Sequence, residues 1–139
     1  MNQKKDVVID ERFFRHDGEY VADANLHIER GAKFNSLKVD GNLTVGENIC
    51  VRSIVVQGDV IVNGNISVED IRVGGNLKVN GNLSIEGDMY VKGDCKIGRF
   101  APSYSNVFIG GKFDTEAVGL SSRIHRISVG YPVVFPEEQ

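Results

Sequence analysis

The amino-acid sequence predicts an all-β fold, a single-stranded triangular β-solenoid in which the chain winds into short coils that stack on one another. Between residues 20 and 97, apolar residues recur in segments of six, six and five residues, so that Leu37, Ile54 and Ile71 stand seventeen residues apart. Within each segment the apolar residues occupy positions i and i+2, as in a strand with one buried face. A fixed period in this range is typical of solenoids, and three segments per period predict three sides.

Turn residues separate the predicted strands. Most six-residue segments end in glycine followed by Asn or Asp, and we expect these glycines to adopt positive φ in tight bends. They are Gly41, Gly58, Gly64, Gly75, Gly81, Gly87 and Gly93. The five-residue segments end without glycine, for example at Arg52-Ser53, so the third corner of each coil should have a different conformation.

The residues after the corner glycines should form ladders along the solenoid. Because equivalent positions stack, we expect one ladder of Asn25, Asn42, Asp59 and Asn76 and a second of Asn48, Asn65 and Asn82. Leu43, Val60 and Leu77 should likewise lie directly above one another in the core.

The chain divides into three parts. Residues 1–19 show no repeat and form an N-terminal tail or cap, in which the pair Phe13-Phe14 would cover the open end of the solenoid. Residues 20–97 form regular coils of about 17–18 residues, estimated from the repeat spacing. Residues 98–139 should contain an irregular stretch at 98–106 (a protruding loop or a bulged side), the last coil or coils, and a proline-bearing C-terminal cap.

Bulk properties exclude several function classes. The formal charge of −3 gives no general case for binding nucleic acid, and membrane association is not signalled. No apolar run approaches the roughly 20 residues that span a bilayer. The N-terminus does not read as a secretory signal, so we expect a cytoplasmic protein.

The sequence shows no catalytic, cofactor or metal site, and we expect no enzymatic activity. His16, His27 and His125 do not share a position in the coil, as a metal site between stacked coils would require. Cys50 should point outward and Cys95 inward, on different sides of the solenoid, beyond disulfide reach. The carboxylates lie mostly in corners, where solvation explains them.

Segments such as GNLKVNGNLSIEGD and GDMYVKGD resemble those of the bactofilins, a polymer-forming family of the bacterial cytoskeleton. The resemblance covers residues 20–97 and rests on the regular spacing of short apolar segments and glycines. It implies a right-handed triangular β-helix that assembles head to head or end to end through apolar terminal coils, without nucleotide. It also implies a scaffold that positions other proteins at the cytoplasmic face of the membrane.

We therefore expect a structural or scaffolding protein whose main partner is a second copy of itself. The candidates for self-association at the ends are Phe13, Phe14, Tyr20, Tyr131, Val133 and Phe135. The candidates for lateral contact with other proteins are the outward apolar residues Val55, Ile61 and Tyr90.

Two alternatives remain open on the sequence. One is a binding or adaptor module of a phage or secretion system, which does not polymerise and contacts a partner through loop 98–106 and the C-terminal segment. The other is a degenerate hexapeptide acyltransferase, whose left-handed helix requires coils of eighteen residues and small side chains where this chain has Leu or Ile.

Overall fold

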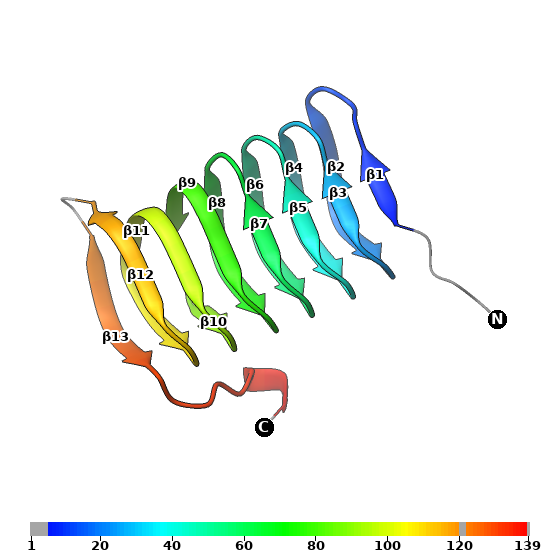
Figure 1. Cartoon of the computed structure of the whole chain (residues 1–139). Coiled ribbons are helices and arrows are strands. Elements are labelled where there is room, and N and C mark those ends of the chain that lie inside the picture. Colours follow the sequence, from blue (N-terminus) through cyan, green and yellow to red (C-terminus); the bar gives the residue numbers. More distant parts are fainter. Residues whose placement is uncertain (1–5, 120–121, 139) are drawn as a thin grey trace.

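The computed structural model describes residues 6–119 and 122–138. Thirteen strands form one continuous parallel sheet that winds around a single axis, with β1 at one end and β12 and β13 at the other (Figure 1). The strands are β1 (Val7–Ile9), β2 (Phe14–Ala22), β3 (Leu26–Ile28), β4 (Ala32–Val39), β5 (Leu43–Val45), β6 (Ile49–Val56), β7 (Val60–Val62), β8 (Ile66–Val73), β9 (Leu77–Ile85), β10 (Met89–Val91), β11 (Cys95–Ile109), β12 (Phe113–Val118) and β13 (Arg123–Val129). A short 3-10 helix, η1 (Pro136–Glu138), follows them. The predicted β-solenoid is confirmed.

The strand pairings define three sides. The first side stacks β1, β3, β5, β7 and the starts of β9 and β11, ending with β12. The second side stacks residues 32–34, 49–51, 66–68 and 83–85 with the middle of β11. The third side stacks residues 20–22, 37–39, 54–56, 71–73, 89–91, 107–109 and 127–129.

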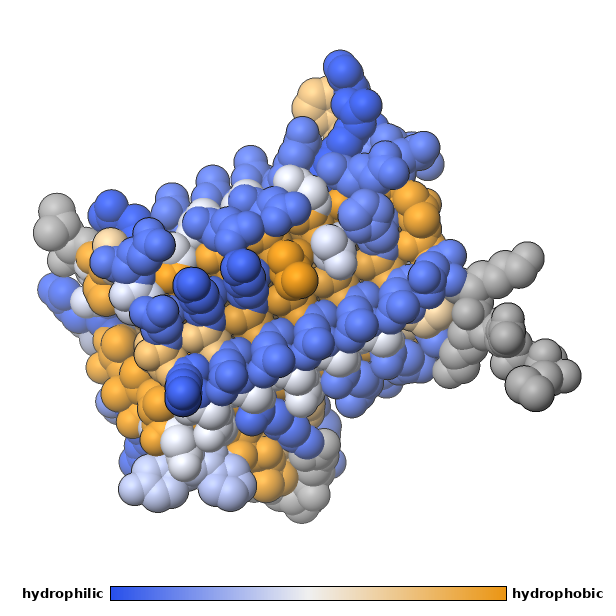
Figure 2. All heavy atoms as spheres, viewed as in Figure 1, coloured by the Kyte–Doolittle hydropathy of each residue, from blue (hydrophilic) through white to orange (hydrophobic). Residues whose placement is uncertain are grey.

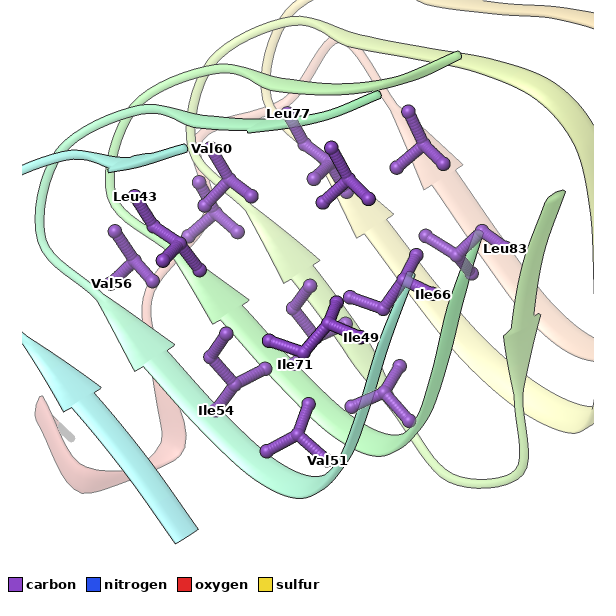
Figure 3. Packing of buried hydrophobic residues seen from close by; sticks show 14 of the residues in the cluster. Leu43, Ile49, Val51, Ile54, Val56, Val60, Ile66, Ile71, Leu77 and Leu83 are labelled. Carbon is purple, nitrogen blue, oxygen red and sulfur yellow. The ribbon is translucent and has the colours of Figure 1, made fainter. Parts of the chain in front are cut away.

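The core consists of equivalent residues stacked coil upon coil. Leu43 pairs with Val60, and Val60 with Leu77, and all three side chains are buried (Figure 3). A single coil cannot bury its own inward residues, so each coil depends on its neighbours for a closed core. The predicted stacking is therefore confirmed. The coil at each end of the solenoid has a neighbouring coil on one side only.

The corner glycines are required by close stacking and not by backbone conformation. Among the described glycines, only Gly18 and Gly130 have positive φ, so the expectation of positive φ at the corners is wrong. A Cβ atom built at Gly58 would overlap the side-chain oxygen of Asn42 and the carbonyl oxygen of Gly41. Successive corners therefore lie so close that no side chain fits between them.

Both predicted ladders are confirmed. In the first, the side-chain oxygens of Asn25, Asn42, Asp59 and Asn76 each accept a hydrogen bond of 2.8 Å from a backbone N–H one coil later. In the second, Asn48 and Asn65 accept equivalent bonds. A third ladder runs through Asp70 and Asp88 at the remaining corner, which has no glycine in β4, β6 and β8 but has Gly87 before Asp88. That corner lies within the continuous strands β4, β6 and β8, which confirms its different conformation.

Residues 98–106 form neither a loop nor a separate element, because they lie in the middle of β11. The register against β9 shifts between Ile97 and Arg99, and Tyr104 has a φ of 52°. Phe100 and Ser105 nevertheless point inward and are fully buried. The bulged side is thus the correct alternative. The protruding loop is wrong, although Tyr104 in this stretch is 73% exposed.

The solenoid begins earlier than the sequence predicts. Residues 1–5 of the expected N-terminal tail lie outside the described residues, but β1 already pairs in register with β3, Val7 opposite Leu26. β2 carries the irregularity that hides this coil in the sequence, since its register against β4 shifts between His16 and Glu19 around Gly18.

The C-terminal segment does not cap the end of the solenoid. After β13 the chain turns back and runs along the outside of the coils, so that η1 lies beneath the neighbourhood of β10 (Figure 1). We call residues 130–138 the strap. Because the strap lies against a side, the last coil has nothing stacked on it among the described residues.

Candidate functional site

The C-terminal end of the solenoid exposes residues that belong to a core. Val118, Ile127 and Val129 pair in register with Phe100, Val107 and Ile109 of β11 and therefore point inward. Their partners are at most 1% exposed, whereas Val118 is 52%, Ile127 46% and Val129 38% exposed. The difference arises because each earlier coil is covered by the next, and the last one is not.

We define the C-terminal end face as the inward residues of this last coil: Phe113, Val118, Ile124, Ile127 and Val129. Phe113 is half-buried, with its ring edge-on to Phe100 at 5.4 Å between centroids. Ile124 is 41% exposed, although its partner in β11, Ser105, is fully buried. Figure 2 shows hydrophobic side chains gathered at this end of the molecule.

The same end has free strand edges. Within the described residues, β12 and β13 pair only with β11, so one edge of each strand has no β-sheet partner. An uncovered edge of regular strand is a template for pairing with another chain. The end therefore offers both apolar side chains and backbone hydrogen-bonding groups.

The N-terminal end is closed by aromatic rings. Phe14, Tyr20 and Phe34 pack against one another with centroids 5.4–6.1 Å apart, and His16 lies edge-on to Tyr20. The inward residues Ile9 and Ala22 are buried there although no further coil stands beyond them among the described residues. Phe14 and Tyr20, two of the predicted end candidates, thus fill this end themselves.

Phe13, the third N-terminal candidate, does not cover the end. Its side chain is 94% exposed and its φ is 57°, so it points into solvent from a strained turn. Of the pair expected to cover this end, only Phe14 does so, together with Tyr20 and Phe34.

The three C-terminal candidates lie in the strap and not at an end, so their predicted position is wrong. Phe135 is buried against the third side, where the Nζ of Lys92 lies 4.5 Å from its ring centroid. Tyr131 is exposed and Val133 is half-buried along the same segment. The residues that form the end face stand in the two preceding strands, β12 and β13, and none of them was a candidate from the sequence.

The lateral candidates do not form one patch. Ile61 is exposed on the first side, whereas Val55 and Tyr90 are half-buried on the third side. Tyr90 stacks on Phe108 with centroids 5.0 Å apart and lies beneath Arg72. Burial raises the pKa of Tyr90 above its ordinary value of 10.0, and the neighbouring Asp88 carboxylate adds to the rise. The phenol therefore stays protonated at neutral pH.

Side chains that could perform chemistry are scattered. Cys50 is exposed and Cys95 is buried, and both thiols are free. Burial raises the pKa of Cys95 from 9.0 to about 12, which makes it a poor nucleophile. His27 and His125 are exposed on β3 and β13. Across residues 6–119 and 122–138, no three His, Cys, Asp or Glu side chains gather to hold a metal ion.

Within the part of the chain that the structure describes, no helix has the length and apolar character needed to cross a membrane. Comparison with known proteins returned no matching family model, no matching curated protein and no matching solved structure.

Proposed function

We propose that this protein is a non-catalytic structural element that associates with a second copy of itself through its C-terminal end face. The observation that supports this most directly is the loss of burial across one coil, from Val107 and Ile109 to Ile127 and Val129. Contiguous exposed apolar surface of this kind marks interaction sites. The resemblance of the repeat to bactofilins favours the same function.

A second copy is the favoured partner because of shape. The end face is the cross-section of one triangular coil, and what buries such a coil elsewhere in the molecule is another coil of the same size. Two identical ends that meet about a two-fold axis present the same patch to each other, which is the commonest form of homodimer. The free edges of β12 and β13 would pair in the same contact.

The energetics predict a reversible association. Burying one Val or Ile side chain fully is worth about 1.5–3 kcal/mol, so covering four that are half-buried gains about 3–6 kcal/mol per copy. Association costs about 4–15 kcal/mol in lost freedom. Because the gain for two copies is of the same size as this cost, the assembly should grow with protein concentration.

The experiment that tests this proposal compares two isoleucines of similar exposure. Ile127 is 46% exposed on the end face, and Ile61 is 41% exposed on the first side. We expect light scattering of the wild-type protein to show a mass that rises with concentration, Ile127→Asp to give a monomer, and Ile61→Asp to behave as wild type. A wild-type protein that stays monomeric at every concentration, or equal loss in both variants, would overturn the proposal.

A further inference from the structure

The strap binds the third side through an aromatic ring and a carboxylate. Phe135 is 2% exposed and sits beside Lys92, and Oε2 of Glu137 lies 3.1 Å from Nε of Arg72. Arg72 in turn lies over the Tyr90 ring, which stacks on Phe108. The third side therefore carries a docking surface, made of Arg72, Tyr90 and Lys92 with Phe108 supporting Tyr90, for an aromatic residue followed two positions later by an acid.

The ion pair between the strap and its own chain lacks hydrogen-bond geometry. Although Arg72 Nε is within ion-pair distance of Glu137, this buried atom makes no hydrogen bond in the described structure. A buried donor without an acceptor is unfavourable. Tyr131 and Val134 are exposed, so Phe135 and Glu137 supply most of the attachment that the structure shows.

The strap leaves the solenoid at the C-terminal end face. From this point the chain can turn back along its own coils or continue onto a second copy. Gly130 follows β13, the last strand, and donates its N–H to the carbonyl of Ile109 at 2.9 Å. Its φ is 88°, and no atom outside its chain neighbours lies within 4 Å of the position a Cβ would take. The turn at Gly130 is thus unsupported by packing and lies in the plane of the C-terminal end face.

The length of the strap permits a crossing to a second copy. On its own chain, Phe135 reaches the level of β10, two strand spacings from β13, or about 10 Å. If two end faces meet with one strand spacing between them, the same site on the partner is three spacings away along the solenoid axis, or about 14 Å in that direction. The five residue steps from Gly130 to Phe135 span up to about 16 Å when extended.

We propose that the straps are exchanged in the assembly, so that Phe135 and Glu137 of each copy occupy the docking surface of the other. This inference rests on the proposed function, because exchange requires the two C-terminal end faces to meet. Exchange of identical segments is a low-cost route to a stable dimer, since each copy keeps the contacts that it makes alone. The strap would thus fasten an association that the end face alone leaves reversible.

The test uses two chains that can be cross-linked only after exchange. In a Cys50→Ser background, one chain carries Arg72→Cys and a differently tagged second chain carries Glu137→Cys; the two are co-expressed and treated with a short bismaleimide. Buried Cys95 should not react. We expect a covalent heterodimer at twice the chain mass, and its loss when Ile127→Asp is added to both chains.

The outcomes separate this inference from the proposed function. If light scattering shows the assembly but no covalent heterodimer forms, exchange is wrong and association through the end face stands. If no assembly forms, both are wrong. The chain that carries both substitutions, Arg72→Cys and Glu137→Cys, should cross-link within itself under conditions that keep it monomeric, which verifies that the reagent bridges this contact.

A charge exchange gives a second readout without chemical modification. Arg72→Glu and Glu137→Arg each place like charges together within one strap contact. Mixed in one assembly, the two variants form opposite-charge pairs only between different copies. We expect the mixture to resist dilution at least tenfold better than either variant alone. A mixture that dissociates like the single variants contradicts exchange.

Discussion

The side-chain oxygen of Asn42 accepts a hydrogen bond of 2.8 Å from the backbone N–H of Asp59, its counterpart one coil later. The bond recurs along the whole ladder at 2.8 or 2.9 Å, so each corner satisfies a backbone donor that the turn leaves without a sheet partner. We expect Asn42→Ala to lower the free energy of unfolding by about 1–2 kcal/mol, because the N–H of Asp59 loses its acceptor. Urea unfolding followed by circular dichroism measures the loss.

Asn63 provides the control for this ladder. Its side-chain oxygen also accepts a hydrogen bond one coil later, at 3.0 Å, but the donor is the exposed side-chain amide of Asn80 and not a backbone N–H. Water can replace that bond, so Asn63→Ala should cost less than about 0.5 kcal/mol. Equal losses in the two variants would show that the ladder has no special part in stability.

Gly58 tests why glycine is needed at the corners. A Cβ there would overlap the Asn42 side chain and the Gly41 backbone, so Gly58→Ala should cost about 2–4 kcal/mol. At Gly31 the nearest atom to a Cβ would be the carbonyl oxygen of Asn48 at 3.1 Å, and Gly31→Ala should cost about 1 kcal/mol or less. Urea unfolding of the two variants makes the comparison.

Replacement by asparagine distinguishes the two explanations for Gly58. Asparagine tolerates positive φ better than alanine does, so it would rescue a corner that needed this conformation. Close stacking predicts no rescue, because the larger side chain meets the same atoms. A Gly58→Asn variant more stable than Gly58→Ala would therefore contradict the stacking explanation.

The coils could be predicted from sequence because their cause is local and repeated. Leu43, Val60 and Leu77 stand seventeen residues apart, and one period places all three in one stack. The reason for the corner glycines could not be read in the same way. Both positive φ and close approach of two backbones demand glycine, and only the positions of residues one coil away decide between them.

The ends could not be predicted because they depend on distant residues. The alternation of Ile127 and Val129 indicates a strand, but nothing local tells whether another coil covers it. The prolines around Phe135 suggest an end cap, yet this residue packs beside Lys92, far away in sequence. The coil at β1 and β2 was missed because Gly18 interrupts its register.

Tyr104 should be one position where glycine stabilises the protein. Its φ of 52° is unfavourable for a residue with a Cβ, and its side chain is 73% exposed, so little packing would be lost. We expect Tyr104→Gly to raise the free energy of unfolding by up to about 1 kcal/mol, after the larger chain entropy of glycine is counted. Tyr104→Val should lower it, since β-branched residues avoid positive φ. Urea midpoints that shift in the same direction for both variants would contradict the strain at this site.

Cys95 should make the stability of the solenoid depend on pH in the alkaline range. Burial raises the pKa of its thiol from 9.0 to about 12, so above pH 9 the unfolded chain loses a proton that the folded chain keeps. The stability that comes from the neutral thiol is thus complete below pH 9 and falls as pH rises toward 12, by at most about 1.4 kcal/mol per pH unit. Cys95→Ala has no thiol to ionise, and its small cavity costs the same at every pH. The wild-type advantage over Cys95→Ala in urea unfolding should therefore shrink between about pH 9 and pH 11. An advantage that stays constant over this range would mean that the thiol ionises as readily in the folded coil as in the unfolded chain.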